Sequence, residues 1–133
     1  MPHLQFETTA RPTDEQKRGF ADTITELYAE HMETGTGHVA VTIRNLEDAS
    51  FSLGRLEAGD DALMLNADIR EGRTFEQQRA FVRAAFEEAN ARWGVPTANT
   101  YAVITEHTGR EFHEYDRVLS SWDDLEAVDD ETV

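Results

Sequence analysis

The first third of the chain changes its hydrophobic period as it proceeds, and each change predicts a new element. The stretch LQFETT alternates, with Leu4 and Phe6 on one side, which is typical of a strand with one buried face. Thr13 and Gln16 have the spacing of a capping box, which begins a helix by exchanging side-chain and backbone hydrogen bonds. The apolar stripe that follows has helical spacing and comprises Phe20, Ile24, Leu27 and His31.

A second strand is predicted after this helix. We expect the glycines of ETGTG to end the helix, because glycine readily adopts the left-handed conformation found at helix ends. HVAVTIR is rich in β-branched residues, which strands favour. The first half of the chain therefore predicts a strand, a helix and a strand.

The second half repeats this pattern. ALMLNADI alternates, and the side predicted to be buried carries Leu63, Leu65, Ala67 and Ile69. Thr74 and Gln77 again have capping-box spacing. The helical stripe recurs as Val82, Phe86, Ala89 and Trp93. TYAVIT supplies the last strand, so the strand–helix–strand unit is used twice. Between the halves, SFSLGR predicts a short strand ending at Gly54, and LEAGDD predicts a turn.

Two such units predict an α/β (α+β) fold. The crossover in each unit makes its two strands parallel, so two units side by side give a four-stranded mixed sheet with both helices on one face. We expect one domain over residues 1–120, with pseudo-repeats at about 2–56 and 62–119. We expect residues 121–133 to form an acidic arm or tail, whose Trp122 and Leu125 are candidates for docking on a neighbouring subunit.

The sheet face without helices raises the question of assembly. Apolar residues alternating onto that face would leave a large exposed patch, which soluble monomers rarely tolerate. Oligomerisation through this face is the expected remedy.

Composition narrows the possible partners. The net charge is −15, with 27 acidic residues against 12 basic ones, so nucleic acids and anionic membranes are not expected to bind. Lys17 is the only lysine, and an acid-rich, lysine-poor surface is typical of proteins kept soluble in concentrated salt. The chain has no cysteine, which excludes thiolate chemistry. It also lacks a signal segment or spanning apolar run, so a soluble cytoplasmic protein is expected.

The candidate chemistry begins at Pro2. Removal of Met1 before this small residue would leave a free secondary amine at the start of the chain. Burial of such an amine and nearby cationic groups both disfavour its charged form. A neutral amine near physiological pH is suited to act as a general base. We therefore expect Pro2 to be a reagent only if it lies in a pocket beside basic groups.

Three stretches support a family resemblance: the leading proline, FSLGRLEAGDDALMLNADIREGRT, and EYDRVL. Together with the duplicated unit, they resemble the tautomerase superfamily, and most closely its cis-3-chloroacrylic acid dehalogenase group. The resemblance implies that Pro2 and Glu114 are catalytic and that Arg70 and Arg73 bind the carboxylate of a small substrate. It also implies a homotrimer.

Two positions depart from that group. Its histidine late in the first helix falls at or near Tyr28, and its tyrosine on the last strand falls at Val103. Tyr101 lies two residues earlier on the same strand face. Tyr28 and Tyr101 are candidate substrate-binding residues, although tyrosines at half-buried positions usually serve packing. These departures weaken the prediction of the group's water-addition chemistry for this chain more than they weaken the prediction of its fold.

The alternatives for the other residues stay open. Taken alone, Arg70 and Arg73 would bridge to surface acids such as Glu71 or Asp68, and Glu114 would be a surface residue. The histidines have no metal-ligand spacing, and there is no glycine-rich phosphate loop, so neither a metal nor a cofactor is expected.

Three functions follow from these residues. The first is a cofactor-independent tautomerase that uses Pro2 as the general base on a small 2-oxo acid. The second is a hydratase, dehalogenase or decarboxylase acting on a small unsaturated or 3-oxo acid, with Pro2 as general acid and Glu114 activating water. The third is a non-catalytic oligomer that binds an acid or a partner protein.

Overall fold

The computed structural model describes residues 2–119. Its main elements, in chain order, are β1 (His3–Thr8), α1 (Asp14–Met32), β2 (Ala40–Asn45), β3 (Leu63–Arg70), α2 (Phe75–Trp93) and β4 (Thr100–His107). Three short 3₁₀ turns complete the described chain: η1 (Asp48–Ser50), η2 (Thr97–Asn99) and η3 (Gly109–Glu111). The predicted acidic arm, with Trp122 and Leu125, lies outside the described residues.

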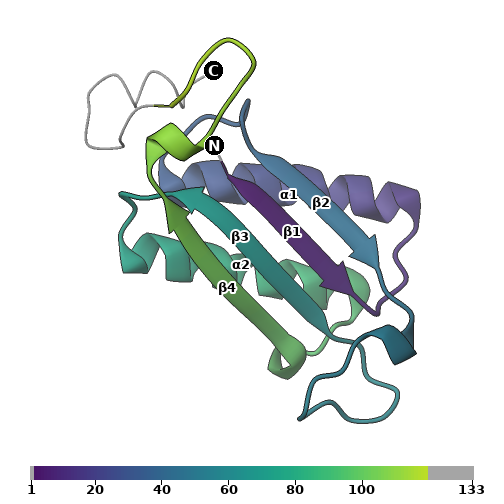
Figure 1. Ribbon diagram of the computed structural model, residues 1–133. Coiled ribbons are helices and arrows are strands. Elements are labelled where there is room, and N and C mark those ends of the chain that lie inside the picture. The colour runs from purple at the N-terminus through teal and green to yellow at the C-terminus, as the bar shows by residue number, and fades with distance from the viewer. Residues whose placement is uncertain (1, 120–133) are drawn as a thin grey trace.

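The four strands form one mixed sheet in the order β2-β1-β3-β4. Strand β1 is parallel to β2, and β3 is parallel to β4, as the two crossovers require. The two units meet through an antiparallel pairing of β1 with β3. Figure 1 shows both helices on the same face of the sheet. The predicted fold class is thereby confirmed.

The hydrophobic core lies between the sheet and the two helices. The alternation predicted for β1 and β3 is observed, since Leu4, Phe6 and the apolar positions of β3 are buried. Phe20 of α1 packs edge-on against Phe6 and also contacts the ring of Trp93 from α2. Each fully buried large side chain of this kind stabilises the fold by about 1.5–3 kcal/mol.

Both helices begin where the sequence indicates. Thr13 and Gln16 form a complete capping box, and Thr74 and Gln77 form a second one. The buried face of α1 differs from the predicted stripe, because it comprises Phe20, Ile24, Tyr28 and Met32. Leu27 is only partly buried and His31 is half-buried. The reason is a contact between the helices, in which Tyr28 packs edge-on against Phe81 of α2.

The buried face of α2 is shifted in the same way. Its fully buried residues are Phe81, Val82, Ala85 and Ala89. Phe86 and Trp93 of the predicted stripe pack against the core but stay partly exposed. Neither α1 nor α2, the two long helices of the described chain, is apolar enough to cross a membrane.

Two predictions for the loops differ from the structure. Helix α1 ends before the glycines of ETGTG, because Glu33 itself takes the left-handed conformation with φ 53°. The strand predicted over SFSLGR, residues 50–55, is wrong: Ser50 ends η1, and residues 51–55 form loop and turn. Side chains anchor this region instead, as Arg55 donates to the carbonyls of Ala98 and Thr100. The turn predicted in LEAGDD is present, with Gly59 at φ 89°.

The sheet face opposite the helices is mostly polar, not apolar. Its side chains bond one another across the strands, as His3 does with Thr42 and Gln5 does with Arg44. Among its few large apolar side chains are Tyr101 and Val103, both of which are exposed. This face therefore has no large apolar patch within the described residues that would require oligomerisation to cover it. The predicted alternation along the strands is observed, but the residues on the side away from the helices are mostly polar.

Candidate functional site

One end of the sheet gathers most of the predicted site residues. Pro2 is buried there, and its carbonyl accepts a hydrogen bond of 3.1 Å from the backbone N–H of Ala40, which begins β2. In the antiparallel ladder His3 lies opposite Asp68. One step further along the ladder brings Pro2 level with Ile69 and next to Arg70. Figure 1 shows the start of β1 at the same end as η3 and the segment after it.

Arg70 and Arg73 are both buried, with only 1% and 6% of their surface exposed. Neither arginine is therefore an exposed surface residue. Arg70 is the last residue of β3, and Arg73 lies in the short turn that leads into α2. The Nε of Arg73 donates to the carbonyl of Met32 over 3.2 Å, at the carboxyl end of α1. That bond fixes the plane of the guanidinium against a helix end where cations are favoured.

Glu114 is held in a small hairpin formed by the segment after β4. Its backbone N–H donates to the carbonyl of Arg117, and the N–H of Leu119 donates to Phe112. The Nε of Arg117 donates to one oxygen of the Glu114 carboxylate. The other oxygen lies 3.0 Å from Nδ1 of His38. The hydrogen bond from Arg117, with the further contribution of His38, lowers the pKa of Glu114 below its ordinary value, so this carboxylate is ionised at neutral pH.

His38 links this hairpin to Pro2. It stands two residues before Ala40, the residue that binds the Pro2 carbonyl. The hairpin therefore contacts the same short segment that holds the start of β1. Through this link, the structure places Glu114 at the Pro2 end of the sheet.

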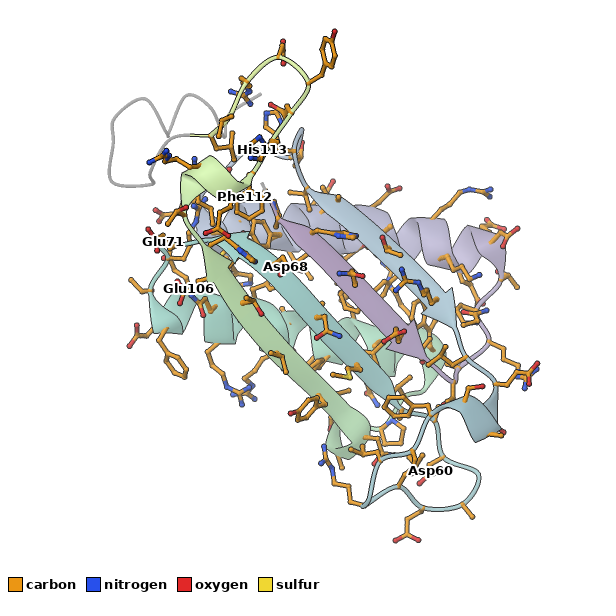
Figure 2. All side chains as sticks on the ribbon, in the orientation of Figure 1. Asp60, Asp68, Glu71, Glu106, Phe112 and His113 are labelled. Carbon is orange, nitrogen blue, oxygen red and sulfur yellow. The ribbon has the colours of Figure 1, made fainter. Side chains whose placement is uncertain are left out.

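A second cluster of polar side chains joins the segment after β4 to the sheet. His107, the last residue of β4, places Nε2 2.8 Å from Asp68 and Nδ1 2.9 Å from Glu111. The hydrogen bond to Asp68, and then that to Glu111, raises the pKa of His107 above its ordinary value. The ring also packs edge-on against Phe112. Figure 2 shows Asp68 and Phe112 together at this end of the sheet, far from Asp60.

The two candidate tyrosines lie in different places. Tyr28 is one helical turn before Met32, and its ring is buried against Phe81 in the core. Tyr101 pairs with Met64 near the start of β4, and 46% of its surface is exposed. Since Glu106 is level with Ile69, Tyr101 lies five strand positions from the Pro2 end, or about 16 Å. Within one chain, the fold does not bring Tyr101 to this end.

The structure also shows residues that sequence reasoning missed. His38 and Arg117, the two partners of Glu114, were not singled out. Arg117 lies inside EYDRVL, three residues after Glu114, and was a detectable partner. His38 is far from both in the sequence, and its position as the first residue of the predicted strand HVAVTIR gave no indication of this contact. The contact of His107 with Asp68 likewise depends on strand register.

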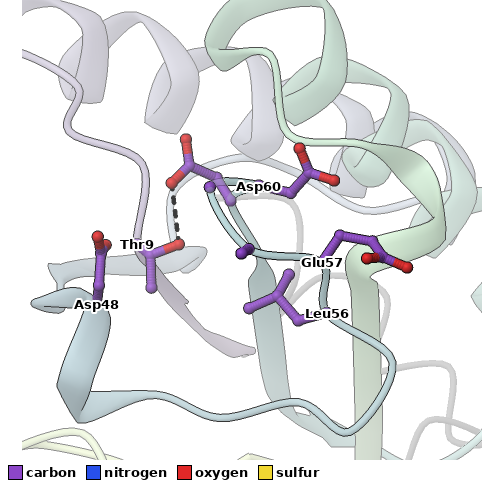
Figure 3. Close-up of a pocket in the computed structure, with 8 residues that line it drawn as sticks. Thr9, Asp48, Leu56, Glu57 and Asp60 are labelled. Atoms are coloured by element: carbon purple, nitrogen blue, oxygen red, sulfur yellow. Dashed lines mark hydrogen bonds between the residues drawn. The ribbon is translucent and has the colours of Figure 1, made fainter.

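Metal sites and cavities elsewhere in the described chain were also compared with the predicted site residues. Within residues 2–119, no group of three or more histidine or acidic side chains is placed to hold a metal ion. A cavity of about 230 Å³ lies at the opposite end of the sheet, beyond the end of β1. Figure 3 shows its lining, which includes Thr9, Asp48, Leu56, Glu57 and Asp60. None of the predicted site residues lines it.

Comparison with known proteins gives a family match for the part of the chain that contains Pro2. The family model described as Tautomerase enzyme matches residues 2–55, which begin at the buried proline and span the first β-α-β unit. The first β-α-β unit of the chain is therefore similar to tautomerase enzymes. A search of curated protein sequences found no match.

Solved structures of the superfamily share the fold over nearly the whole chain. N1, a member of the cis-3-chloroacrylic acid dehalogenase family, is 22% identical with a TM-score of 0.75, over 88% of this chain and 84% of its own. W0 fused 4-OT, a wild-type symmetric trimer, is 16% identical with a TM-score of 0.77, over 90% and 97%. Pt0534, solved after inactivation by 2-oxo-3-pentynoate, is 19% identical with a TM-score of 0.72, over 85% and 92%. At these identities the likeness concerns the fold alone.

Proposed function

We propose that this protein is a cofactor-independent tautomerase that interconverts the keto and enol forms of a small 2-oxo acid, with Pro2 as the general base. The observation that carries the proposal is the burial of Pro2 beside the buried Arg70 at one end of the sheet. A free secondary amine at that buried position, next to Arg70 along the strand ladder, would be desolvated and near a cationic group. Both conditions favour its neutral, basic form.

The two arginines would bind the substrate in this proposal. A guanidinium stays charged and can hold a carboxylate through two parallel hydrogen bonds. Although the chain carries a net charge of −15, paired arginines in a buried site reverse the local potential for a small anion. They would also stabilise the negative charge that grows on the enolate oxygen as the proton leaves carbon.

The proton transfer balances without any further reagent. The Pro2 nitrogen takes a proton from the enol hydroxyl or from the carbon next to the carbonyl. The carbon–carbon double bond shifts accordingly, and the same proton, or one from water, returns at the other position. The product has the same composition as the substrate, and Pro2 returns to its neutral form.

The test uses the enol form of phenylpyruvate, whose decay to the ketone is followed by absorbance. Wild-type protein, with loss of Met1 verified by mass spectrometry, should accelerate this decay over buffer. Pro2→Ala keeps a free amine but removes the ring, and we expect about a 10²-fold or larger loss of kcat/KM. No acceleration by wild-type protein that has lost Met1 would contradict the proposal and favour a non-catalytic binding protein.

A second activity is favoured by the state of Glu114. The hydrogen bond from Arg117 keeps this carboxylate ionised, and an ionised carboxylate can take a proton from water as it adds to an unsaturated acid. Pro2 in its protonated form would then act as general acid. The measurement is chloride release from 3-chloroacrylate. Release that Glu114→Gln abolishes would support this activity, and its absence in wild-type protein would contradict it.

The proposed enzyme acts as a homotrimer. This part rests on the symmetric trimer of W0 fused 4-OT, which has the same fold. Sedimentation equilibrium should give three times the mass of the 15.0 kDa chain. A single-chain mass at working concentration would contradict it.

A further inference from the structure

We infer that His38 is a positioning residue that ties the Glu114 carboxylate to the strand segment holding Pro2. The inference rests on the proposed function for its catalytic consequence. Its structural content, a fixed tautomer of His38 between Glu114 and Arg117, can be tested without any activity. The first evidence is that both ring nitrogens have a partner, at 3.0 Å from Glu114 and 2.9 Å from Arg117.

The partners decide the tautomer of the ring. A guanidinium only donates hydrogen bonds, so Nε2 of His38 must accept from Arg117 and carries no proton. Nδ1 then carries the ring proton and donates to the carboxylate of Glu114. The imidazole is therefore neutral, with its proton at Nδ1. An imidazolium would direct an N–H at the guanidinium and lose the Arg117 contact.

Glu114, Arg117 and His38 form a closed triangle. Arg117 donates to both of the others, while Glu114 accepts from both. Only 10% of the His38 side chain is exposed, so its two bonds lie largely out of water. Glu114 and Arg117 are part-exposed, so the buried His38 ring is the member of the triangle that most depends on its partners, which makes the arrangement sensitive to the shape of the side chain at position 38.

The triangle is also linked to Pro2 through the backbone from His38 to Ala40. His38 contacts Glu114 through its side chain, and Ala40 binds the Pro2 carbonyl through its N–H. Residues 38–40 therefore hold the two candidate catalytic groups from one short segment. The distance between the Pro2 nitrogen and the Glu114 carboxylate depends on how firmly His38 is held.

The direct test is the nitrogen NMR spectrum of the histidine ring in the wild-type protein. We expect His38 to show a protonated Nδ1 and an unprotonated Nε2 at neutral pH, with the assignment made by comparison with His38→Gln. An Nε2-protonated ring, or an imidazolium at neutral pH, would overturn the inference. This result does not depend on whether the protein proves to be a tautomerase.

Two variants separate the bonds made by His38. In His38→Asn the side-chain amide can replace the Nδ1 donor to Glu114, whereas in His38→Gln the polar group lies nearer the position of Nε2. We expect Asn to keep most of kcat and Gln to lower kcat roughly tenfold or more, since misplacement of a catalytic group by about 1 Å is costly. KM should change little in both, because neither variant touches the arginines proposed to bind the substrate.

His113→Asn is the matched control. His113 precedes Glu114 in the same hairpin, and its side chain makes no hydrogen bond or ion pair with other residues of the described chain, 2–119. We expect its kcat and KM to equal those of wild-type protein. Equal loss of kcat in His38→Asn and His38→Gln, or loss in His113→Asn, would assign the effect to general disturbance of the hairpin and overturn the positioning role.

Discussion

Arg73 shows at the scale of a single residue how one side chain combines a structural and a proposed substrate-binding role. Its Nε binds the carbonyl of Met32, which belongs to the last turn of α1. The bond compensates part of the negative end of that helix and fixes the guanidinium plane. A carboxylate substrate would then meet an arginine whose orientation is already set, so less conformational freedom is lost on binding.

This double role gives a prediction for Arg73→Lys. Lysine keeps the charge but cannot offer two parallel hydrogen bonds from a fixed plane. We expect kcat/KM for enol phenylpyruvate to fall roughly tenfold to a hundredfold, which corresponds to loss of one charge-assisted hydrogen bond. Denaturant unfolding should show a loss of about 1–2 kcal/mol, since the Met32 carbonyl loses its partner.

Arg92→Lys is the control for this change. Arg92 is also an arginine near a helix end, but it binds Glu88 and Thr23 on the surface. It should leave kcat/KM unchanged and stability within about 0.5 kcal/mol. If Arg73→Lys behaved like Arg92→Lys in both measurements, neither role of Arg73 would stand.

At the scale of the elements, the duplication supplies an internal control. Thr13 begins α1 and Thr74 begins α2 through the same capping box. Thr74 directly follows Arg73, whereas Thr13 lies at the far end of α1 from Met32. The two caps are chemically equal but differ in their distance from the candidate site.

We therefore predict that Thr13→Ala and Thr74→Ala each cost about 1 kcal/mol of stability, measured by denaturant unfolding. Only Thr74→Ala should also lower kcat, because fraying of the first turn of α2 loosens the turn that carries Arg73. Equal kcat in both variants would show that the start of α2 does not position the arginine.

The segment after β4 gives a prediction of pH dependence. The hydrogen bonds from His107 to Asp68 and to Glu111 raise the pKa of His107 in the folded protein. The folded protein thus binds this proton more tightly than the unfolded chain, whose histidine pKa is about 6.5. The stabilisation is fully present below that value and is lost as pH rises through the folded pKa.

Hydrogen exchange, corrected for the intrinsic pH dependence of exchange, measures this effect. The amides of residues 112–119 should lose protection on the alkaline side in wild-type protein. His107→Asn should remove this alkaline loss, since asparagine does not titrate. Protection that rises with pH in the wild-type protein would contradict the assignment.

At the scale of the whole molecule, the features that follow local rules could be predicted from the sequence. Strand alternation placed Leu4 and Phe6 in the core, and capping-box spacing located both helix starts. Features decided by distant contacts could not be predicted. The pairing of Tyr28 with Phe81 turned the buried face of α1, and the contact of His38 with Glu114 joins two loops that only the folded sheet brings together.

The candidate site could also be predicted only in part. Pro2, Arg70 and Arg73 could be proposed because the family resemblance marks their positions, and the structure finds all three buried at one end. Their supporting contacts with Met32 and Ala40 involve backbone atoms, which no residue pattern identifies. The sequence could therefore indicate the candidate site residues, but not how they are held.

The central claim is that the mature chain presents a neutral proline nitrogen in a buried site beside arginines. The most direct measurement is covalent labelling with 2-oxo-3-pentynoate, the 2-oxo acid that inactivated the related Pt0534, followed by peptide mass spectrometry. The account predicts loss of Met1 and one adduct per chain on the Pro2 nitrogen, formed more slowly in Arg73→Lys. A retained Met1, or an adduct placed elsewhere with Pro2 unmodified, would contradict it.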